Sequence, residues 1–184
     1  MPAKRKTSAN EIYQIKITLL WTEIWRCLLV PSDLTLDLLH YVLQAAMGWE
    51  NDHLHEFRVG QHSYGEPDIE DMMDEGEVQL NQVLRRVGSK VEYTYDFGDN
   101  WEHSIVLEKR LPIDPKLTYP LCIAGERACP PEDCGGVGGF FQLMEAIRNP
   151  DHPEHEEQLE WVGEDYDPEA FSIETVNRKF REGV

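Results

Sequence analysis

The sequence predicts an α+β domain in which a mainly antiparallel sheet is covered by helices. Two observations predict this fold class: alternating apolar and polar residues dominate residues 11–110, and helical spacing dominates from residue 139 onward. Strand patterns that come first and mix with helices, followed by helices alone, favour an antiparallel sheet covered on one side. The chain has 184 residues, which suits one domain. We expect residues 1–10 to form a flexible basic tail and residues 11–184 a single α+β domain with C-terminal helices.

The first part of this domain is expected to contain a hairpin and a helix. Residues 11–20 alternate between apolar and polar side chains, and the apolar run that follows within a few residues ends at Pro31. Two such stretches in close succession predict paired antiparallel strands. Apolar residues then recur at helical spacing over residues 36–47, and Gly48 can end this helix in a left-handed turn.

A second hairpin gives the strongest pattern in the chain, between residues 90 and 111. Two alternating stretches flank the segment Gly98-Asp99-Asn100, which we expect to be a three-residue loop. A two-residue loop would slip the register by one and set apolar residues opposite polar ones, on the wrong face. The expected pairs are Phe97 with Trp101, Tyr95 with His103, and Tyr93 with Ile105.

The remainder of the chain is expected to be a long connection and then helices. Residues 111–139 are rich in proline, glycine and cysteine and carry no strand pattern. Helical spacing after this connection predicts three helices, at residues 139–149, 153–163 and 172–183.

The net charge of −18 limits the kinds of molecule that the protein is expected to bind. Proteins that bind nucleic acid gain affinity by neutralising phosphates with Lys and Arg, so a chain this acidic is not expected to bind nucleic acid. No apolar run approaches the about 18 residues of a membrane helix, and no signal peptide is evident, so we expect a cytoplasmic protein that does not enter a membrane. The acidic stretches are either solvated faces or a surface for a basic protein partner or a cation.

The segment GERACPPEDCGGVGGF, residues 125–140, is the most unusual in the chain. It lacks the Gly-Lys-Ser/Thr ending of a Walker loop, and acids precede its glycines, so a phosphate-binding loop is excluded. Prolines fix φ and glycines permit positive φ, so we interpret the segment as a stiff, sharply bent loop that forms one wall of a site. Arg127 either clamps a carboxylate or phosphate of a ligand or holds Glu132 or Asp133.

The same segment also suggests a zinc site. Cys122, Cys129 and Cys134, with His155 further along, are ligand types that zinc prefers, although their spacing is wider than that of a usual zinc knuckle. The alternative is that these cysteines are small buried hydrophobic residues in a rigid loop. In a cytoplasmic protein the four cysteines are expected to be thiols or metal ligands and not disulfides.

Histidines and acids form a second constellation of candidate site residues. The stretch HLHEF predicts a strand with His53, His55 and Phe57 on one face. The hairpin contributes His103 to its apolar face, where a lone histidine is more often a core residue than a ligand. The register expected above sets Asp96 opposite Glu102, a pair of like charges that needs water, a base or a cation to compensate it. Further candidates from the hairpin are Asp99 and Trp101.

Three motifs in order also resemble a known family. The stretches GWENDHLHEF, YDFGDNWEH and CIAGERACPPEDCGGVGGF are similar to those of a prokaryotic family named after open reading frame three of the root-inducing (Ri) plasmid, over about Ile12 to Phe180. The resemblance implies an α+β fold and a mobile-element neighbourhood, because members are often described as TnpR-like resolvases or passengers of insertion elements. Resolvase activity itself is disfavoured, because serine recombinases need several active-site arginines and a basic DNA-binding module.

The sequence therefore favours a binding or interaction module for a small ligand or a partner protein. Its site is expected between the FGDNW turn, the HLHEF strand and the ACPPEDCGG loop. The alternative function is a metal-dependent, hydrolase-like enzyme that uses His, Asp, Glu and Cys of the same motifs, with zinc as its candidate cofactor.

Overall fold

The structure, a computed structural model, describes residues 11–67, 71–163 and 165–183. The expected basic tail, residues 1–10, lies outside the described residues. Within the described ranges, no helix is long and apolar enough to cross a membrane.

One sheet of eight strands organises the domain, in the order β5-β4-β3-β6-β7-β1-β2-β8. All neighbouring strands are antiparallel except β4 and β5, which are parallel. The predicted α+β class with a mainly antiparallel sheet is confirmed. The strands are β1 (Glu11–Leu19), β2 (Trp25–Pro31), β3 (His55–Val59), β4 (His62–Gly65), β5 (Met73–Asp74), β6 (Lys90–Tyr95), β7 (Trp101–Pro112) and β8 (Leu121–Glu126).

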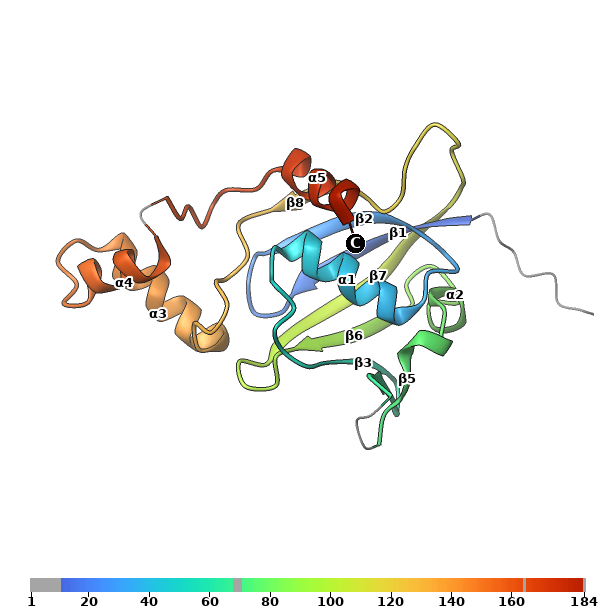
Figure 1. Ribbon diagram of the computed structural model, residues 1–184, viewed down its shortest axis with the longest axis horizontal. Helices are drawn as coiled ribbons and strands as arrows, with labels where there is room; N and C mark the ends of the chain where they lie inside the picture. The colour runs from blue at the N-terminus through green and yellow to red at the C-terminus, as the bar shows by residue number, and fades with distance from the viewer. Residues whose placement is uncertain (1–10, 68–70, 164, 184) are drawn as a thin grey trace, which may run out of the picture.

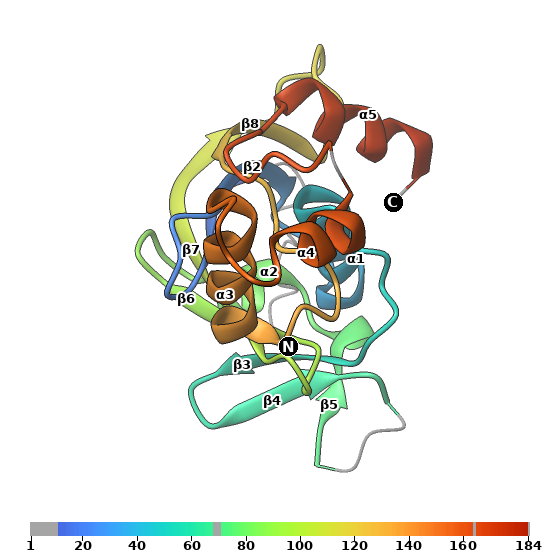
Figure 2. The ribbon, with the colours of Figure 1, turned by 90° about the vertical axis from the view of Figure 1, so that its left-hand side faces the viewer.

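The helices cover one face and one end of this sheet. Helices α1 and α5 lie across the same face, while α3 and α4 pack together beyond one end of the strands (Figure 1). A view turned by 90° looks onto this end of the sheet, with α3 and α4 nearest the viewer (Figure 2). The helices are α1 (Leu36–Met47), α2 (Leu80–Val83), α3 (Gly136–Arg148), α4 (His155–Val162) and α5 (Ile173–Gly183), with a 3-10 turn at Glu75–Glu77.

The core lies between α1 and the face of the sheet that α1 covers. Strand β1 alternates as its sequence predicts, and Ile15, Ile17 and Leu19 are fully buried on one face. Helix α1 buries Leu39 and Leu43 against this layer and ends at the expected left-handed Gly48, whose N–H donates to Gln44 O. The three predicted C-terminal helices are confirmed within a few residues of their expected bounds.

Strand β8 was not expected, because residues 111–139 carry no alternating pattern. It pairs with β2. Gly125 contributes no side chain to the strand, because the ring of Phe171 packs directly against its backbone. A Cβ atom at Gly125 would lie 2.7 Å from Cε1 of Phe171, so only glycine fits beneath that ring. The edge of β8 is covered by α5, where Asn177 accepts a hydrogen bond from Cys122 N (2.8 Å) and donates one to Cys122 O (2.9 Å).

The expected register of the β6–β7 hairpin is wrong by two residues. Tyr95 pairs with Trp101 and Tyr93 pairs with His103, so residues 96–100 form a five-residue turn. Because the shift is an even number, every side chain keeps its face, but Phe97 falls in the turn and is 46% exposed. The expected pair of Asp96 and Glu102 does not exist either, since Thr94 lies opposite Glu102.

A buried arginine fixes the point where the stiff loop leaves β8. The side chain of Arg26 is almost fully buried, and its guanidinium donates to the carbonyl oxygens of Ala46 (3.0 Å), Glu126 (2.8 Å) and Arg127 (2.8 Å). The same guanidinium lies over the ring of Phe171, 4.4 Å from its centroid. Burial lowers the pKa of Arg26, but its donors are satisfied by backbone carbonyls. Arg26 thus joins β2, the end of α1 and the start of the loop.

Candidate functional site

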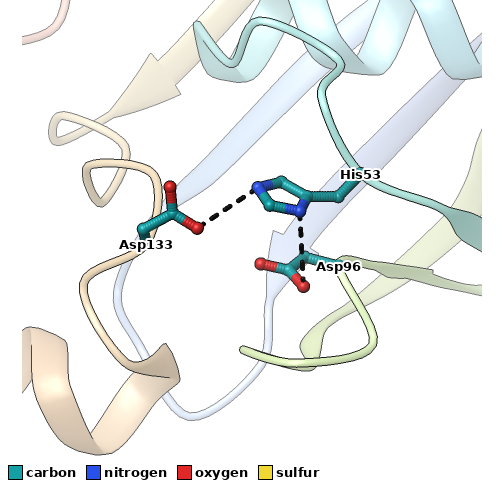
Figure 3. Close-up of side chains that lie close together, drawn as sticks. All are labelled: His53, Asp96 and Asp133. Carbon is teal, nitrogen blue, oxygen red and sulfur yellow. Dashed lines mark ion pairs between the residues drawn. The ribbon is translucent and has the colours of Figure 1, made fainter.

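Three segments that are distant in sequence meet around the imidazole of His53. His53 lies in the loop between α1 and β3, its Nδ1 is 3.8 Å from Asp96 Oδ1, and its Nε2 is 3.3 Å from Asp133 Oδ1 (Figure 3). A third carboxylate is close, since Glu132 Oε2 lies 3.7 Å from the same Nε2. His53 thereby connects the α1–β3 loop, the β6–β7 turn and the proline- and glycine-rich loop.

Asp96 is held in place by the turn that it begins. Its backbone has a φ of 57°, and its carboxylate accepts a hydrogen bond from Gly98 N at 2.8 Å. Its own N–H donates to Leu54 O at 2.9 Å, which joins the turn to the segment that carries His53. Asp96 is only 6% exposed, so its carboxylate is fixed and nearly desolvated beside the imidazole. Aspartate tolerates the left-handed conformation better than most residues, which explains its place here.

The stiff loop is fastened to the other two segments by hydrogen bonds. Trp49 Nε1 donates to Pro130 O at 3.0 Å, and the N–H of Glu50 donates to Glu132 Oε1 at 2.9 Å. At the glycine half of the loop, Gly135 N donates to Asp99 Oδ2 at 3.1 Å. Residues 129–135 therefore form a wall against the β6–β7 turn.

Gly136 makes the closest contact between the loop and the turn. A Cβ atom there would lie well inside 3.0 Å of the carbonyl oxygen of Asp99 and 3.2 Å from its carbonyl carbon. The backbone of Gly136 also has a φ of 67°, which disfavours any residue with a side chain. Only glycine therefore allows this approach.

Within the described residues, the carboxylates around His53 form no ion pair with a lysine or an arginine. Among the ion pairs of the described residues, Asp96, Glu132 and Asp133 pair only with His53. Tyr95 lies beneath them and donates its hydroxyl to Glu132 Oε1 at 3.2 Å. Burial and the Glu132 charge raise the pKa of Tyr95, so the phenol stays protonated and adds no charge. The site thus carries an excess of negative charge.

A cavity of about 490 Å³ opens beside Asp133, between α3 and α4. Its lining adds the carboxylates of Glu154, Glu157 and Glu160 to that of Asp133, next to the half-exposed ring of Trp161. Carboxylates around an opening raise the local concentration of cations there. The approach to His53 from this side is therefore favourable for a positively charged species.

His55 does not share the site with His53. It is the first residue of β3 and points into the core, where its Nε2 lies 2.9 Å from Glu75 Oε2. Its ring stacks on that of His40 with centroids 3.5 Å apart. His53 precedes the strand, so the expectation that both histidines project from one strand face is wrong. His55 and Phe57 do share the buried face.

His40 links this buried layer to the His53 loop. Its Nε2 contacts Oδ1 of Asn51, and its Nδ1 lies 2.8 Å from the hydroxyl of Tyr93. Since the amide oxygen only accepts, Nε2 carries the proton and Nδ1 accepts from Tyr93. Burial and the charge of His55 lower the pKa of His40 to about 4, against a smaller opposing effect of Asn51. His40 is therefore neutral near pH 7 and positions the loop.

His103 and Trp101 belong to the core beneath the site. His103 is 1% exposed, its Nδ1 lies 3.3 Å from Tyr93 O, and its ring meets that of Trp49 edge-on. Burial lowers the pKa of His103 to about 4. Trp101 is fully buried and its ring lies 6.0 Å from that of Trp49. The hydrogen bonds and ring contacts of these two side chains among the described residues are with Tyr93 and Trp49, so we assign them the role of supporting the site from below.

Arg127 lies away from the carboxylates that it was expected to hold. Its Nη2 is 2.6 Å from Glu23 Oε2 and its Nη1 is 3.4 Å from Glu169 Oε1, so its partners are not Glu132 or Asp133. The backbone of Arg127 has a φ of 65°, and the side chain pairs with Glu23 of the β1–β2 turn. Asp99, in contrast, is at the expected place and fastens the loop through Gly135.

The predicted zinc ligands do not converge. Among the described residues, the His, Cys, Asp and Glu side chains that could hold a metal as a group of three are His53, Asp96 and Asp133, and no cysteine is among them. Cys122 lies in β8, and burial raises its pKa to about 11. Burial also raises the pKa of Cys129, while His155 Nδ1 lies 2.9 Å from Ala146 O. All four cysteines, which include Cys27 and Cys134, are free.

The comparisons with known proteins match nearly the whole chain. The family model described as "Plasmid pRiA4b ORF-3-like protein" matches residues 11–175. The chain belongs to the plasmid pRiA4b ORF-3-like family. A relative in Sinorhizobium fredii, "Uncharacterized protein y4hQ", is 40% identical over 174 residues, which cover 91% of this chain and 89% of that protein.

A solved structure has the same fold as this pRiA4b ORF-3-like chain. The crystal structure of "Protein of Unknown Function MM3350" from Methanosarcina mazei Go1 is 36% identical and superposes with a TM-score of 0.84. The match covers 91% of this chain and 98% of that one. The resemblance expected from the three sequence motifs is therefore confirmed.

Sequence reasoning missed several members of the site in this pRiA4b ORF-3-like chain. Asp133 and Glu132 were considered as partners of Arg127 and not as members of the site, and Tyr95 only as a strand residue paired with His103. The sequence around Glu132 and Asp133 carried one usable signal, since these acids directly follow two prolines. Prolines restrict the backbone, so acids beside them keep a fixed position in the loop. The buried pair of His55 and Glu75 had no such signal, since Glu75 comes from an acidic segment without a period.

Proposed function

We propose that the protein is a binding module that takes one divalent transition-metal ion between His53, Asp96 and Asp133. One observation carries the proposal: each residue offers one ligand atom, and the three atoms lie within 4.8 Å of one another. Ligands at about 2.0–2.2 Å from a metal lie roughly 3.0–3.5 Å apart, so a small closure of the side chains suffices. The exposed carboxylate of Asp133 (74% exposed) has room for that movement, whereas Asp96 is fixed.

The charge of the site supports a cation as the ligand. Carboxylates close together repel one another, and here the described ion pairs give them no Lys or Arg. A divalent ion would remove this repulsion. The mixed set of one imidazole and two carboxylates favours zinc or manganese over magnesium or calcium, which prefer oxygen ligands alone.

The backbone conformations around the site support the same proposal. Four non-glycine residues with positive φ lie in the three segments that meet at His53, and such conformations cost free energy that the surrounding structure must offset. They are Asn51 (64°), Asp96 (57°), Asn100 (55°) and Asp133 (56°). Together they orient two ligands toward a third.

Isothermal titration calorimetry on protein without a histidine tag tests this function. We expect one zinc or manganese ion to bind per chain, and magnesium or calcium to bind at least about tenfold more weakly. Asp96→Asn retains an acceptor for Gly98 N and is expected to lose about tenfold or more in zinc affinity, as is Asp133→Asn. Asp151→Asn, an exposed acid elsewhere, is the matched control and should bind as the wild type. Equal zinc affinity of Asp133→Asn and Asp151→Asn would refute the proposal.

Metal-dependent hydrolysis is a second candidate function, favoured by the position of Glu132. Three protein ligands leave positions open for water, as catalytic zinc sites do, and Glu132 lies 3.7 Å from His53 where it can accept a proton from such a water. Glu132→Gln retains an acceptor for Glu50 N, so it is expected to bind zinc normally and to lose zinc-dependent hydrolysis of a p-nitrophenyl ester. Turnover no faster than that of free zinc would remove this candidate and leave the binding module.

We further propose that the protein acts in the cytoplasm. Its four cysteines are free thiols, two of them buried and two half-buried. Thiols persist in reducing compartments, whereas disulfides form and persist in oxidising ones. Fractionation of cells that express the native protein, followed by immunodetection, tests the location, and recovery from the periplasm would contradict it.

A further inference from the structure

A second cavity, of about 310 Å³, lies on the other side of α3 from the α4 cavity. It is bounded by the β1–β2 turn, by α3 and by the segment that leads to α5. Its inner wall is apolar and includes Ile24, Phe140 and Met144, which are all buried, at 1%, 6% and 5% exposure. A volume at the lower end of the usual range suits a small ligand.

Two arginines line this cavity in an otherwise acidic part of the chain. Between Lys116 and Arg178 the sequence contains many acids, and its only lysine or arginine residues are Arg127 and Arg148. Both of these bases line the same cavity. The same cavity is lined by the carboxylates of Glu23 and Glu169, so the two guanidiniums bind an anion there only where it replaces one of these carboxylates.

The two guanidiniums already share one carboxylate. Glu169 Oε1 lies 2.7 Å from Nη2 of Arg148 and 3.4 Å from Nη1 of Arg127. Glu23 pairs with the other terminal nitrogen of Arg127 at 2.6 Å. The side chain of Glu169 is 53% exposed, so it can leave for water when another carboxylate takes its place. The geometry that would hold a ligand carboxylate is therefore already formed.

Aromatic side chains form the outer rim of the cavity. Trp21 is 77% exposed at the β1–β2 turn and Phe141 is 52% exposed on α3. Trp21 has a φ of 66°, an unusual conformation for a bulky residue, and Arg127 has a φ of 65°. Strained residues often cluster at ligand sites, because such conformations cost free energy and persist where the surrounding structure holds them for function.

We propose that this cavity binds an organic monocarboxylate with a small aromatic or aliphatic body. The carboxylate replaces that of Glu169 between Arg127 and Arg148, and the apolar body contacts Trp21 and the inner wall. Arginine binds carboxylates through paired, charge-assisted hydrogen bonds, and the apolar wall adds affinity in proportion to the area that it covers. The site is independent of the metal site at His53.

The test uses 3-phenylpropanoate as the probe and 3-phenylpropanol as its neutral counterpart. Binding is followed by NMR through the indole N–H signal of Trp21, assigned by its absence in Trp21→Phe. We expect a saturable shift with the acid and at least about tenfold weaker binding of the alcohol, which lacks the charge-assisted bonds.

Two variants with opposite expected signs make the test specific. Glu169→Gln removes the internal competitor and should tighten binding of the acid by about tenfold, while Arg148→Gln should weaken it by about tenfold. Arg148 is largely exposed and bonds Glu169, so this variant is expected to fold. Glu145→Gln, exposed on α3, removes the same charge as Glu169→Gln and should bind as the wild type.

Several results would overturn the proposal. One is the lack of a saturable shift up to about 10 mM acid in both the wild type and Glu169→Gln, since that limit corresponds to negligible affinity. Others are equal binding of acid and alcohol, or equal binding by Arg148→Gln and Glu145→Gln. Zinc affinity, measured in parallel, should be the same in all of these variants.

Discussion

Replacing Gly136 by alanine is expected to separate the stiff loop from the β6–β7 turn. The new Cβ atom would lie well inside 3.0 Å of the carbonyl oxygen of Asp99, and the residue would have to keep a φ of 67°. A left-handed conformation costs a residue with a side chain about 1–2 kcal/mol, and overpacking costs about 1–3 kcal/mol more. We therefore expect Gly136→Ala to lower the free energy of unfolding by about 2–5 kcal/mol.

Gly138 provides a matched control two residues further along. It lies in the same helix, it is exposed, and a Cβ atom there would have no neighbour within 4 Å. Alanine in a compatible helical position is expected to stabilise the fold by about 0.4–1 kcal/mol. The two variants thus make the same chemical change with opposite expected signs.

Urea unfolding, followed by circular dichroism, measures both variants under the same conditions. The slope m should stay constant, so the difference appears in the midpoint concentration. Calorimetry with zinc should then give a lower affinity for Gly136→Ala under conditions in which it is still folded, because Asp133 moves with the loop. If Gly136→Ala is as stable as Gly138→Ala and binds zinc as tightly, the loop does not need this close approach and the reasoning is wrong.

Three further perturbations test other parts of the structure. Zinc at saturating concentration should raise the melting temperature of the wild type and raise that of Asp133→Asn by clearly less, because weaker binding stabilises the fold less, as scanning calorimetry would detect. The pKa values of His40 and His103 are lowered from 6.5 to about 4, so both stay neutral in the folded protein while the unfolded chain binds protons. Stability should therefore be complete above about pH 6.5 and fall toward pH 4, by up to roughly 2.7 kcal/mol per pH unit if both contribute. Urea unfolding at several pH values should show that the unfolding free energy of His103→Leu falls less steeply with falling pH than that of the wild type. An equally steep fall would contradict this assignment. Arg26→Met should lose about 3 kcal/mol or more of unfolding free energy, because buried carbonyls lose their donors; a loss below about 1 kcal/mol would show that Arg26 is not the anchor.

The sequence predicts the strands and helices of this fold well where apolar side chains recur at a regular spacing, either that of a strand or that of a helix. The alternation of β1 and the helical spacing of α1 arise from burial of one face, which is a local property of the sequence. Strand β8 was missed because its residues are selected by contacts with Phe171 and Asn177, both far away in the chain. The β6–β7 register was wrong because the Asp96 turn is built by side-chain and backbone hydrogen bonds that alternation does not encode.

The candidate site was only partly predictable for a similar reason. His53, Asp96 and the loop were expected to come together, since stiff segments near a hairpin turn leave few alternatives. Both acids of the loop, Glu132 and Asp133, lie near His53, and the backbone there includes a φ of 56° at Asp133 and a φ of 65° at Arg127, which lies away from His53. Such backbone conformations follow from tertiary contacts and cannot be inferred from residue types.

The metal site at His53 is tested most directly by a crystal structure of untagged protein grown with zinc, with data recorded at the zinc absorption edge. We expect one strong anomalous peak per chain within bonding distance, about 2.0–2.2 Å, of a ring nitrogen of His53 and of carboxylate oxygens of Asp96 and Asp133. A peak at the cysteines or at His155 in place of this one, or no peak at zinc saturation, would contradict it.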